Sequence, residues 1–153
     1  MGETNFQPAE IVAALERHGV RYVVIGGLAA TLHGSSVMTT DANICPARER
    51  DDLERLARAL VEVRATFLAR IDVALNLTTK FGDLDLSFIP SGTGGFPDLD
   101  QHAVPMSLMG RPVAVASLAD VIRSKEAANR PKDQIALPAL RLLLERMKAR
   151  GND

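Results

Sequence analysis

The order of apolar and polar residues along the chain predicts a mixture of helices and strands. Apolar residues recur with the spacing of one helix face in residues 8–18 and 51–64. In the second segment, that face carries Leu53, Leu56, Leu60 and Val63. Strict alternation over residues 83–89 predicts a strand with three apolar side chains on one face, namely Leu84, Leu86 and Phe88. The continuous β-branched run in residues 21–26 is typical of a strand covered on both sides.

Shorter patterns, together with glycine and proline positions, predict the remaining elements. Further strands are expected at residues 41–45, 73–79, 104–109 and 112–116. Further helices are expected at residues 28–33, after the Ser117-x-x-Asp120 cap, and at 133–149, where Pro138 implies a late start or a kink. The glycine-rich residues 90–97 predict a surface loop, with a mobile lid as the alternative. The expected fold is α/β (α+β), one domain over residues 1–153 with a mixed sheet of about five strands flanked by helices.

Composition limits the class of protein. Apolar residues make up 46% and charged residues 24% of the chain, as in ordinary globular domains, which excludes a disordered or coiled-coil protein. No apolar run reaches the roughly 18 residues of a membrane span, and no secretory signal opens the sequence. We therefore expect a cytoplasmic protein with no membrane partner. The single cysteine, Cys45, cannot form an internal disulfide.

The formal net charge of −1 hides two unlike regions. Residues 1–110 hold nine basic and fourteen acidic residues, which gives −5, whereas residues 111–150 hold nine basic and four acidic residues, which gives +5. Such asymmetry suits an acidic metal site that faces a basic phosphate-binding or nucleic-acid-binding surface. Ordinary solvated helix faces in the C-terminal third explain the same charges equally well.

Glycines and acids stand at positions that suit a nucleotide and a metal ion. Gly26-Gly27 follows a predicted strand and precedes a short helix, so backbone N–H groups could approach a phosphate there, although a simple strand-to-helix turn is the plainer interpretation. Asp41 and Asn43 are two residues apart on a predicted strand and therefore project from one face. Asp85, on a later strand, could complete a set of oxygen ligands for Mg²⁺.

These residues fall within longer segments that resemble a known family. VVIGGLAATLHGSSVMTTDANI is similar to the signature of the nucleotidyltransferase (polymerase β-like) superfamily. FGDLDLSFIPSGTGGFPDL resembles the segment that carries its third acid, and VASLADVIRSKEAANRPKD resembles a later helix that ends in R-x-K-D. The resemblance is closest to the minimal, toxin–antitoxin-associated branch, and it extends over about residues 20–145.

The resemblance implies transfer of a nucleoside monophosphate from a nucleoside triphosphate, such as ATP, to a hydroxyl of RNA (a tRNA end) or of a protein. Mg²⁺ would bind Asp41, Asn43 and Asp85, of which Asp41 and Asp85 would be catalytic. The residues expected to hold the triphosphate are Gly26, Gly27, Ser36, Lys125, Arg130 and Lys132. A cognate toxin or antitoxin protein is a further implied partner. The sequence leaves the base, the acceptor and the oligomeric state open.

Asn43 departs from the family pattern, which has an acid at this position. An amide oxygen can bind a divalent cation but brings no charge, so the catalytic metal would bind more weakly. The site could be naturally degenerate, inactivated by engineering, or a variant with one firmly bound metal. Asp83 could compensate, although a solvent-facing role is the plainer interpretation. The alternative function is a non-catalytic protein of this fold that binds a nucleotide or a partner protein, and an unrelated α/β binding domain is the third.

Overall fold

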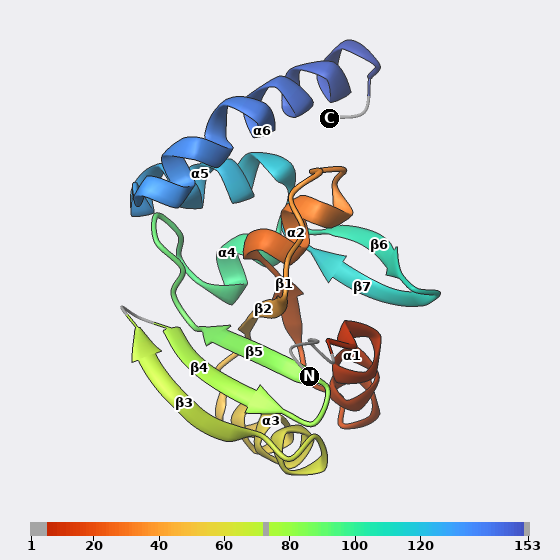
Figure 1. The fold of residues 1–153 in the computed structure, drawn as a ribbon. Coiled ribbons are helices and arrows are strands. Elements are labelled where there is room, and N and C mark those ends of the chain that lie inside the picture. The colour runs from red at the N-terminus through yellow and green to blue at the C-terminus, as the bar shows by residue number, and fades with distance from the viewer. Residues whose placement is uncertain (1–5, 72–73, 152–153) are drawn as a thin grey trace.

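A computed structural model describes residues 6–71 and 74–151 of the chain, and its strands form one mixed sheet (Figure 1). Seven strands lie in the order β3-β4-β5-β2-β1-β7-β6. The pairs β2–β5 and β1–β7 are parallel and the other neighbours are antiparallel. The strands are β1 Tyr22–Val24, β2 Asp41–Pro46, β3 Thr66–Ile71, β4 Ala74–Thr79, β5 Gly82–Ser87, β6 Val104–Leu108 and β7 Arg111–Val115.

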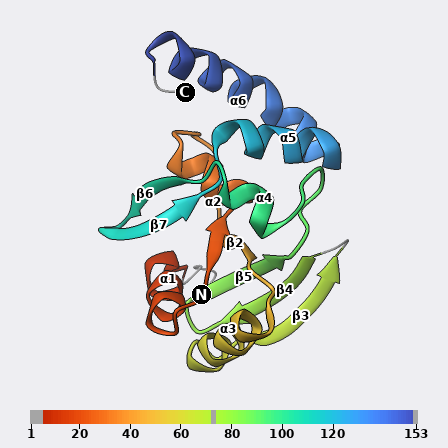
Figure 2. The same ribbon diagram turned by 180° about the vertical axis from the view of Figure 1, so that it is seen from behind.

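Six helices accompany the sheet in the described part of the chain. They are α1 Pro8–Arg17, α2 Gly26–Leu32, α3 Arg50–Glu62, α4 Phe96–Asp100, α5 Leu118–Ala128 and α6 Pro131–Ala149. Both views place α5 and α6 together at one end of the molecule and α3 at the opposite end (Figure 1, Figure 2). Helix α2 packs on β2 and on α5. Among these helices, none combines the length and the apolar character needed to cross a bilayer.

The core confirms the main alternation predicted from the sequence. Val23 and Val24 of β1 are fully buried, as expected for a strand covered on both sides. On β5, Leu84 and Leu86 are buried in the core, whereas Asp83 is exposed. Strand β5 therefore separates an apolar face from a face that carries its aspartates.

One position of the apolar stripe predicted for α3 is wrong. Leu53 is 42% exposed, whereas Asp52, Leu56 and Ala59 are buried. Asp52 turns inward because it receives two hydrogen bonds from Arg21, and Leu56 and Ala59 follow it at helical spacing on the same face. Leu53 lies one residue, about 100°, away from that face.

Several predicted boundaries also change. The sheet has seven strands rather than about five, because β3 was not predicted and both strands of the 104–116 region join the sheet. Helix α4 was not predicted either. Helix α2 begins at Gly26 rather than at residue 28, and residue 73 of the predicted strand 73–79 lies outside the described residues. Helix α6 begins at Pro131 and continues through Pro138, so of the two alternatives expected for Pro138, a late start or a kink, the late start is wrong.

The glycine-rich loop lies directly against α5. A Cβ atom on Gly92 would come within 2.6 Å of the Cβ atom of Ala127 and 3.3 Å of the carbonyl oxygen of Arg123. Gly92 also has a φ of +71°, in the left-handed region that favours glycine. The predicted loop therefore makes a close backbone approach to α5 at Gly92, and its last two residues, 96–97, begin the unpredicted helix α4.

Candidate active site

Polar side chains from three neighbouring strands meet at Asp85. The sheet register places Asn43 of β2 and Asn76 of β4 on either side of this residue of β5. Asn43 Nδ2 donates a hydrogen bond to Asp85 Oδ2 at 3.0 Å, and Asn76 Nδ2 donates to Asp85 Oδ1. Each carboxylate oxygen of Asp85 therefore accepts from one amide, and these two amides fix its orientation.

Asp41 supplies a second carboxylate beside Asp85. It begins β2, where Thr39 Oγ1 donates to Asp41 Oδ1 at 3.1 Å. Burial, followed by the adjoining carboxylate of Asp41, raises the pKa of Asp85 to about 6. Two carboxylates that disfavour each other's negative charge form an arrangement that a cation stabilises.

Asp83 stands apart from this pair. It pairs with Asp41 in the register of β2 and β5, but its side chain is exposed. Its negative charge accounts for a smaller part of the rise in the pKa of Asp85. The solvent-facing interpretation of Asp83 is therefore confirmed, and its influence on Asp85 acts through charge across the surface.

Gly26 brings the backbone close to this group of polar side chains. Its φ is +63°, and a Cβ atom at this position would come within 2.8 Å of Asn43 Oδ1. At Gly27, a Cβ atom would lie 3.3 Å from Thr39 Oγ1. The glycine pair therefore lets the first turn of α2 lie directly against the polar end of β2.

A cavity of about 710 Å³ collects most of the predicted site residues. Those that line it are Gly26, Gly27, Asp41, Asn43, Asp85, Lys125, Arg130 and Lys132. The predicted residue Ser36 is exposed and is not among the lining residues, whereas its neighbour Ser35 is. The Ser35 N–H donates to the carbonyl oxygen of Ala30 at 2.9 Å, which ties Ser35 to the end of α2 and leaves Ser36 one residue farther out.

The basic side chains of the cavity come from the end of α5 and the start of α6. The side chain of Lys125 is only 16% exposed, and its Nζ lies 3.6 Å from Asp133 Oδ1. Burial lowers the pKa of Lys125, against the opposing attraction of Asp133. Arg130 and Lys132 are more exposed and follow in the turn between the two helices and in the first turn of α6.

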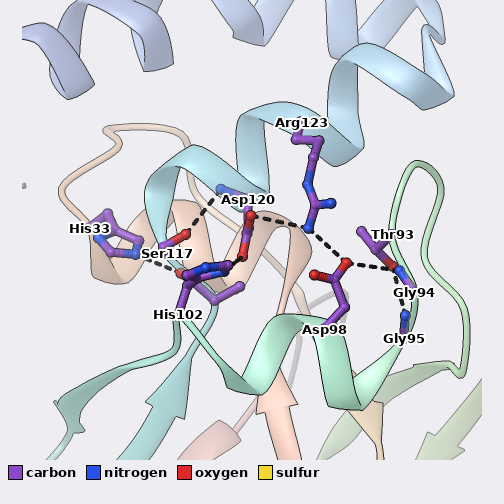
Figure 3. Close-up of polar contacts among 10 residues, drawn as sticks. His33, Thr93, Gly94, Gly95, Asp98, His102, Ser117, Asp120 and Arg123 are labelled. Atoms are coloured by element: carbon purple, nitrogen blue, oxygen red, sulfur yellow. Dashed lines mark hydrogen bonds and ion pairs between the residues drawn. The ribbon is translucent and has the colours of Figure 1, made fainter.

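A second polar cluster reaches the cavity through Asp120, which is among its lining residues. Figure 3 shows Asp120 and Arg123 of α5 and Asp98 of α4 pointing toward one another. Arg123 Nη2 lies 3.1 Å from Asp120 Oδ1 and 2.9 Å from Asp98 Oδ2, and His102 Nδ1 lies 3.3 Å from Asp120 Oδ2. Asp98 also accepts from the backbone N–H of Gly94 at 2.8 Å. The cluster therefore attaches the glycine-rich loop and α4 to α5.

The oxygen donors beside Asp41 fit a hard divalent cation, although they do not form a set of three acids. Within residues 6–71 and 74–151, no three His, Cys, Asp or Glu side chains group together as a metal site. Asp41 and Asp85 nevertheless provide two carboxylates on adjacent strands. Asn76 Oδ1 is buried, has no hydrogen-bond partner among the described atoms, and belongs to a residue that lines the cavity. Carboxylate and amide oxygens are the ligands that Mg²⁺ and Ca²⁺ prefer.

Two residues of this arrangement were not predicted. Asn76 has no distinguishing signal in the sequence, because only the register of β4 against β5 brings it to Asp85. Asp133 belongs to the R-x-K-D segment noted in the sequence, but its full burial was not predicted. The R-x-K-D spacing was the available signal for Asp133.

Comparison with known proteins identifies the architecture. No protein-family model matches the sequence, and no curated protein matches it. The antibiotic-resistance factor ANT(2'')-Ia has a similar structure, with a TM-score of 0.64 and 16% identity over 94% of this chain and 83% of its own. The lincosamide antibiotic adenylyltransferase LnuA, solved with lincomycin, has a TM-score of 0.64 and 13% identity over 89% of this chain and 95% of its own. The chain has the nucleotidyltransferase fold.

A third structure with the nucleotidyltransferase fold is that of TM1012 from Thermotoga maritima, a protein proposed to be a nucleotidyltransferase. It has a TM-score of 0.60 and 18% identity, and the similarity covers 91% of each chain. The nucleotidyltransferase-like fold predicted from the sequence is therefore confirmed. At these identities the similarity establishes the fold and leaves chemistry to the residues of the site.

Proposed function

We propose that this protein is a Mg²⁺-dependent nucleotidyltransferase that transfers a nucleoside monophosphate from a nucleoside triphosphate to a hydroxyl group. The observation that carries the proposal is that one cavity is lined both by the carboxylates of Asp41 and Asp85 and by Lys125, Arg130 and Lys132. Transfer needs both kinds of group, because carboxylates hold the cation and basic side chains pair with phosphate oxygens. The nucleotidyltransferase fold supports the same activity.

The carboxylates have distinct tasks in this proposal. Asp41 and Asp85 would hold Mg²⁺, which when bound neutralises phosphate charge and orients the triphosphate. Asp85 can also accept the proton of the attacking hydroxyl, since with its pKa of about 6 it is ionised at neutral pH. Asn43 and Asn76 hold its two oxygens in a fixed orientation during that step.

The bond changes and the basic residues complete the reaction. The acceptor oxygen forms a bond to the α-phosphorus, the bond from that phosphorus to the β-phosphate oxygen breaks, and pyrophosphate leaves. Lys125, Arg130 and Lys132 would pair with the negative charge that collects on the leaving group. Gly26 and Gly27 line the cavity at the first turn of α2, where backbone N–H groups would face the triphosphate.

The acceptor has three candidates within this proposal. The sequence resemblance favours the end of an RNA such as tRNA, or a protein hydroxyl, in a cytoplasmic toxin–antitoxin system with a cognate partner protein. The similarity to LnuA adds a small hydroxylated antibiotic. A cavity of about 710 Å³ lies within the range of roughly 300–1,000 Å³ that small-molecule sites occupy, which favours a small acceptor.

The second candidate function is a non-catalytic nucleotide-binding protein. It is favoured by the orientation of Asn43, whose nitrogen faces Asp85 as a donor and whose oxygen lies toward Gly26. Asn43 brings no negative charge where the family pattern has an acid, and in this orientation it presents a donor rather than an oxygen ligand beside Asp85. Metal binding at Asp41 and Asp85 would then be too weak to support transfer.

Incubation of the protein with each labelled nucleoside triphosphate, Mg²⁺ and the three classes of acceptor distinguishes the two functions. Transfer by the natural sequence excludes the non-catalytic alternative, and it should be lost in Asp85→Asn but retained in Asp83→Asn, the exposed aspartate of the same strand. Activity only after Asn43→Asp identifies a scaffold that lacks one metal ligand. Failure of both the natural sequence and Asn43→Asp to bind any triphosphate overturns both functions.

A further inference from the structure

Asp133 is a fully buried carboxylate that lies behind the basic residues of the cavity. Its Oδ2 accepts hydrogen bonds from the backbone N–H of Arg130 at 3.0 Å and from Arg130 Nε at 2.7 Å. Its Oδ1 accepts from Arg130 Nη2 at 3.3 Å and lies 3.6 Å from Lys125 Nζ. Although burial disfavours its charge, the hydrogen bonds from Arg130 hold the pKa of Asp133 below its ordinary value.

The contacts of Asp133 join two helices at the edge of the cavity. Lys125 lies in the last turn of α5 and Arg130 immediately precedes α6, with Asn129 between them in the left-handed conformation at a φ of +51°. Lys125 and Arg130 line the cavity, whereas Asp133 is not among its lining residues. One carboxylate therefore contacts both cations from the side away from the ligand space.

An ammonium group as buried as that of Lys125 needs a compensating charge. Without one, desolvation would favour either its neutral form or a different rotamer that reaches solvent. Asp133 is fixed by the first turn of α6, so it also fixes where the Lys125 ammonium group lies. The hydrogen bonds that Nε and Nη2 of Arg130 donate to Asp133 likewise restrict the rotation of the Arg130 guanidinium group.

We propose that Asp133 is a positioning residue for polyphosphate recognition. It holds Lys125 and Arg130 so that their cations face the triphosphate of the nucleotide, without itself contacting the ligand. This inference rests on the proposed function, because it assigns Lys125 and Arg130 to the phosphates. It adds a residue whose effect on nucleotide affinity passes entirely through its two neighbours.

Asp52 provides a matched control elsewhere in the molecule. It is buried at 1% exposure in the first turn of α3 and accepts from the backbone N–H of Glu49 at 3.2 Å. Arg21 donates to both of its oxygens at 2.9 and 2.7 Å, and Arg55 lies 3.7 Å away as a second cation. None of these four residues lines the cavity that Asp41 borders. Asp52→Asn therefore removes an equivalent buried charge without touching the cavity.

The test measures the binding of inorganic tripolyphosphate in the presence of Mg²⁺ by isothermal titration calorimetry. Asp133→Asn should weaken binding about tenfold, the effect of losing roughly one charge-assisted contact, whereas Asp52→Asn should stay close to the natural sequence. Both variants should lose similar thermal stability, since both lose one buried charge. The proposal is overturned if Asp133→Asn binds tripolyphosphate as tightly as Asp52→Asn does.

A ligand-free measurement separates this inference from the proposed function. Side-chain ¹³C relaxation should report Lys125 as ordered in the natural sequence and as mobile as the exposed Lys132 in Asp133→Asn. If tripolyphosphate binds neither to the natural sequence nor to either variant, the proposed function fails. Unchanged order of the Lys125 side chain in Asp133→Asn would separately refute the positioning role of Asp133. Should Asp133→Asn fail to fold, Asp133→Glu takes its place, because it keeps the charge but moves the carboxylate by one methylene. Unaltered affinity and unaltered Lys125 order in that variant also overturn the inference.

Discussion

The substitution Asn43→Asp should make the stability of the protein depend on Mg²⁺. In the structure, Asn43 Nδ2 donates to Asp85 Oδ2 at 3.0 Å, and the variant replaces this donor with a third carboxylate next to Asp41. Two unit charges about 4 Å apart repel by about 4 kcal/mol at an effective dielectric constant of roughly 20, and rotation or protonation relieves part of this. We expect the metal-free free energy of unfolding at pH 8 to fall by about 2 kcal/mol, or roughly 4–8 °C in Tm.

Mg²⁺ should reverse this loss, because a cation converts repulsion among the carboxylates into shared ligation. Binding at about one hundred times Kd adds about 2.7 kcal/mol to the free energy of unfolding. The assay is thermal unfolding, followed by circular dichroism with chelator or with saturating Mg²⁺. Gln101→Glu, at an exposed position that does not line the cavity, controls for the added charge. Metal-free Asn43→Asp that is as stable as the natural sequence would contradict this prediction. An equal rise in Tm with Mg²⁺ in Asn43→Asp and in the natural sequence would contradict it too.

Three further predictions follow from individual contacts. The pKa of Asp85 is raised from 3.8 to about 6 in the folded protein, so the natural sequence loses stability as the pH rises through that window. In urea unfolding, Asp85→Asn should therefore be the more stable protein above pH 6 but not below pH 4. A difference in stability that does not depend on pH would contradict this prediction. Gly26→Ala should cost at least about 1 kcal/mol more in unfolding free energy than Gly110→Ala, which has a φ of +85° but open space around its Cβ position. Equal losses of unfolding free energy in the two variants would mean that the Asn43 side chain can move away from the new Cβ atom without destabilising the protein. Cys45 is fully buried and burial raises its pKa to about 12, so a thiol reagent should modify it only as fast as the protein unfolds, and rapid modification of the native protein would contradict this burial.

The elements with strong periodicity or clear caps could be predicted from the sequence. Ser117 caps α5 as expected, with its Oγ accepting from the N–H of Asp120 at 3.1 Å. Strand β3 could not be predicted, because Phe67 and Leu68 are both more than half exposed and give no alternation at this sheet edge. Helix α4 is a single short turn after Gly95, and its buried Leu99 is too isolated to form a pattern.

Only the part of the site that depends on the sequence positions of its residues could be predicted. The spacing of Asp41 and Asn43 and the later Asp85 sufficed to expect one cluster, because parallel pairing of β2 with β5 brings equivalent positions together. The neighbour of Asp85 on β4, Asn76, depends on antiparallel register, which the sequence does not specify. The burial of Asp133 depends on how α5 and α6 pack, so its role at the cavity could not be inferred from R-x-K-D alone.

The central claim is that one cavity joins a cation site at Asp41 and Asp85 to basic residues that hold the triphosphate. Calorimetric titration of a non-hydrolysable nucleoside triphosphate, with and without Mg²⁺, tests it most directly. Binding should require Mg²⁺, be lost in Asp85→Asn and persist in Asp83→Asn. Absence of binding to the natural sequence, or binding that neither chelation of Mg²⁺ nor Asp85→Asn alters, would contradict it.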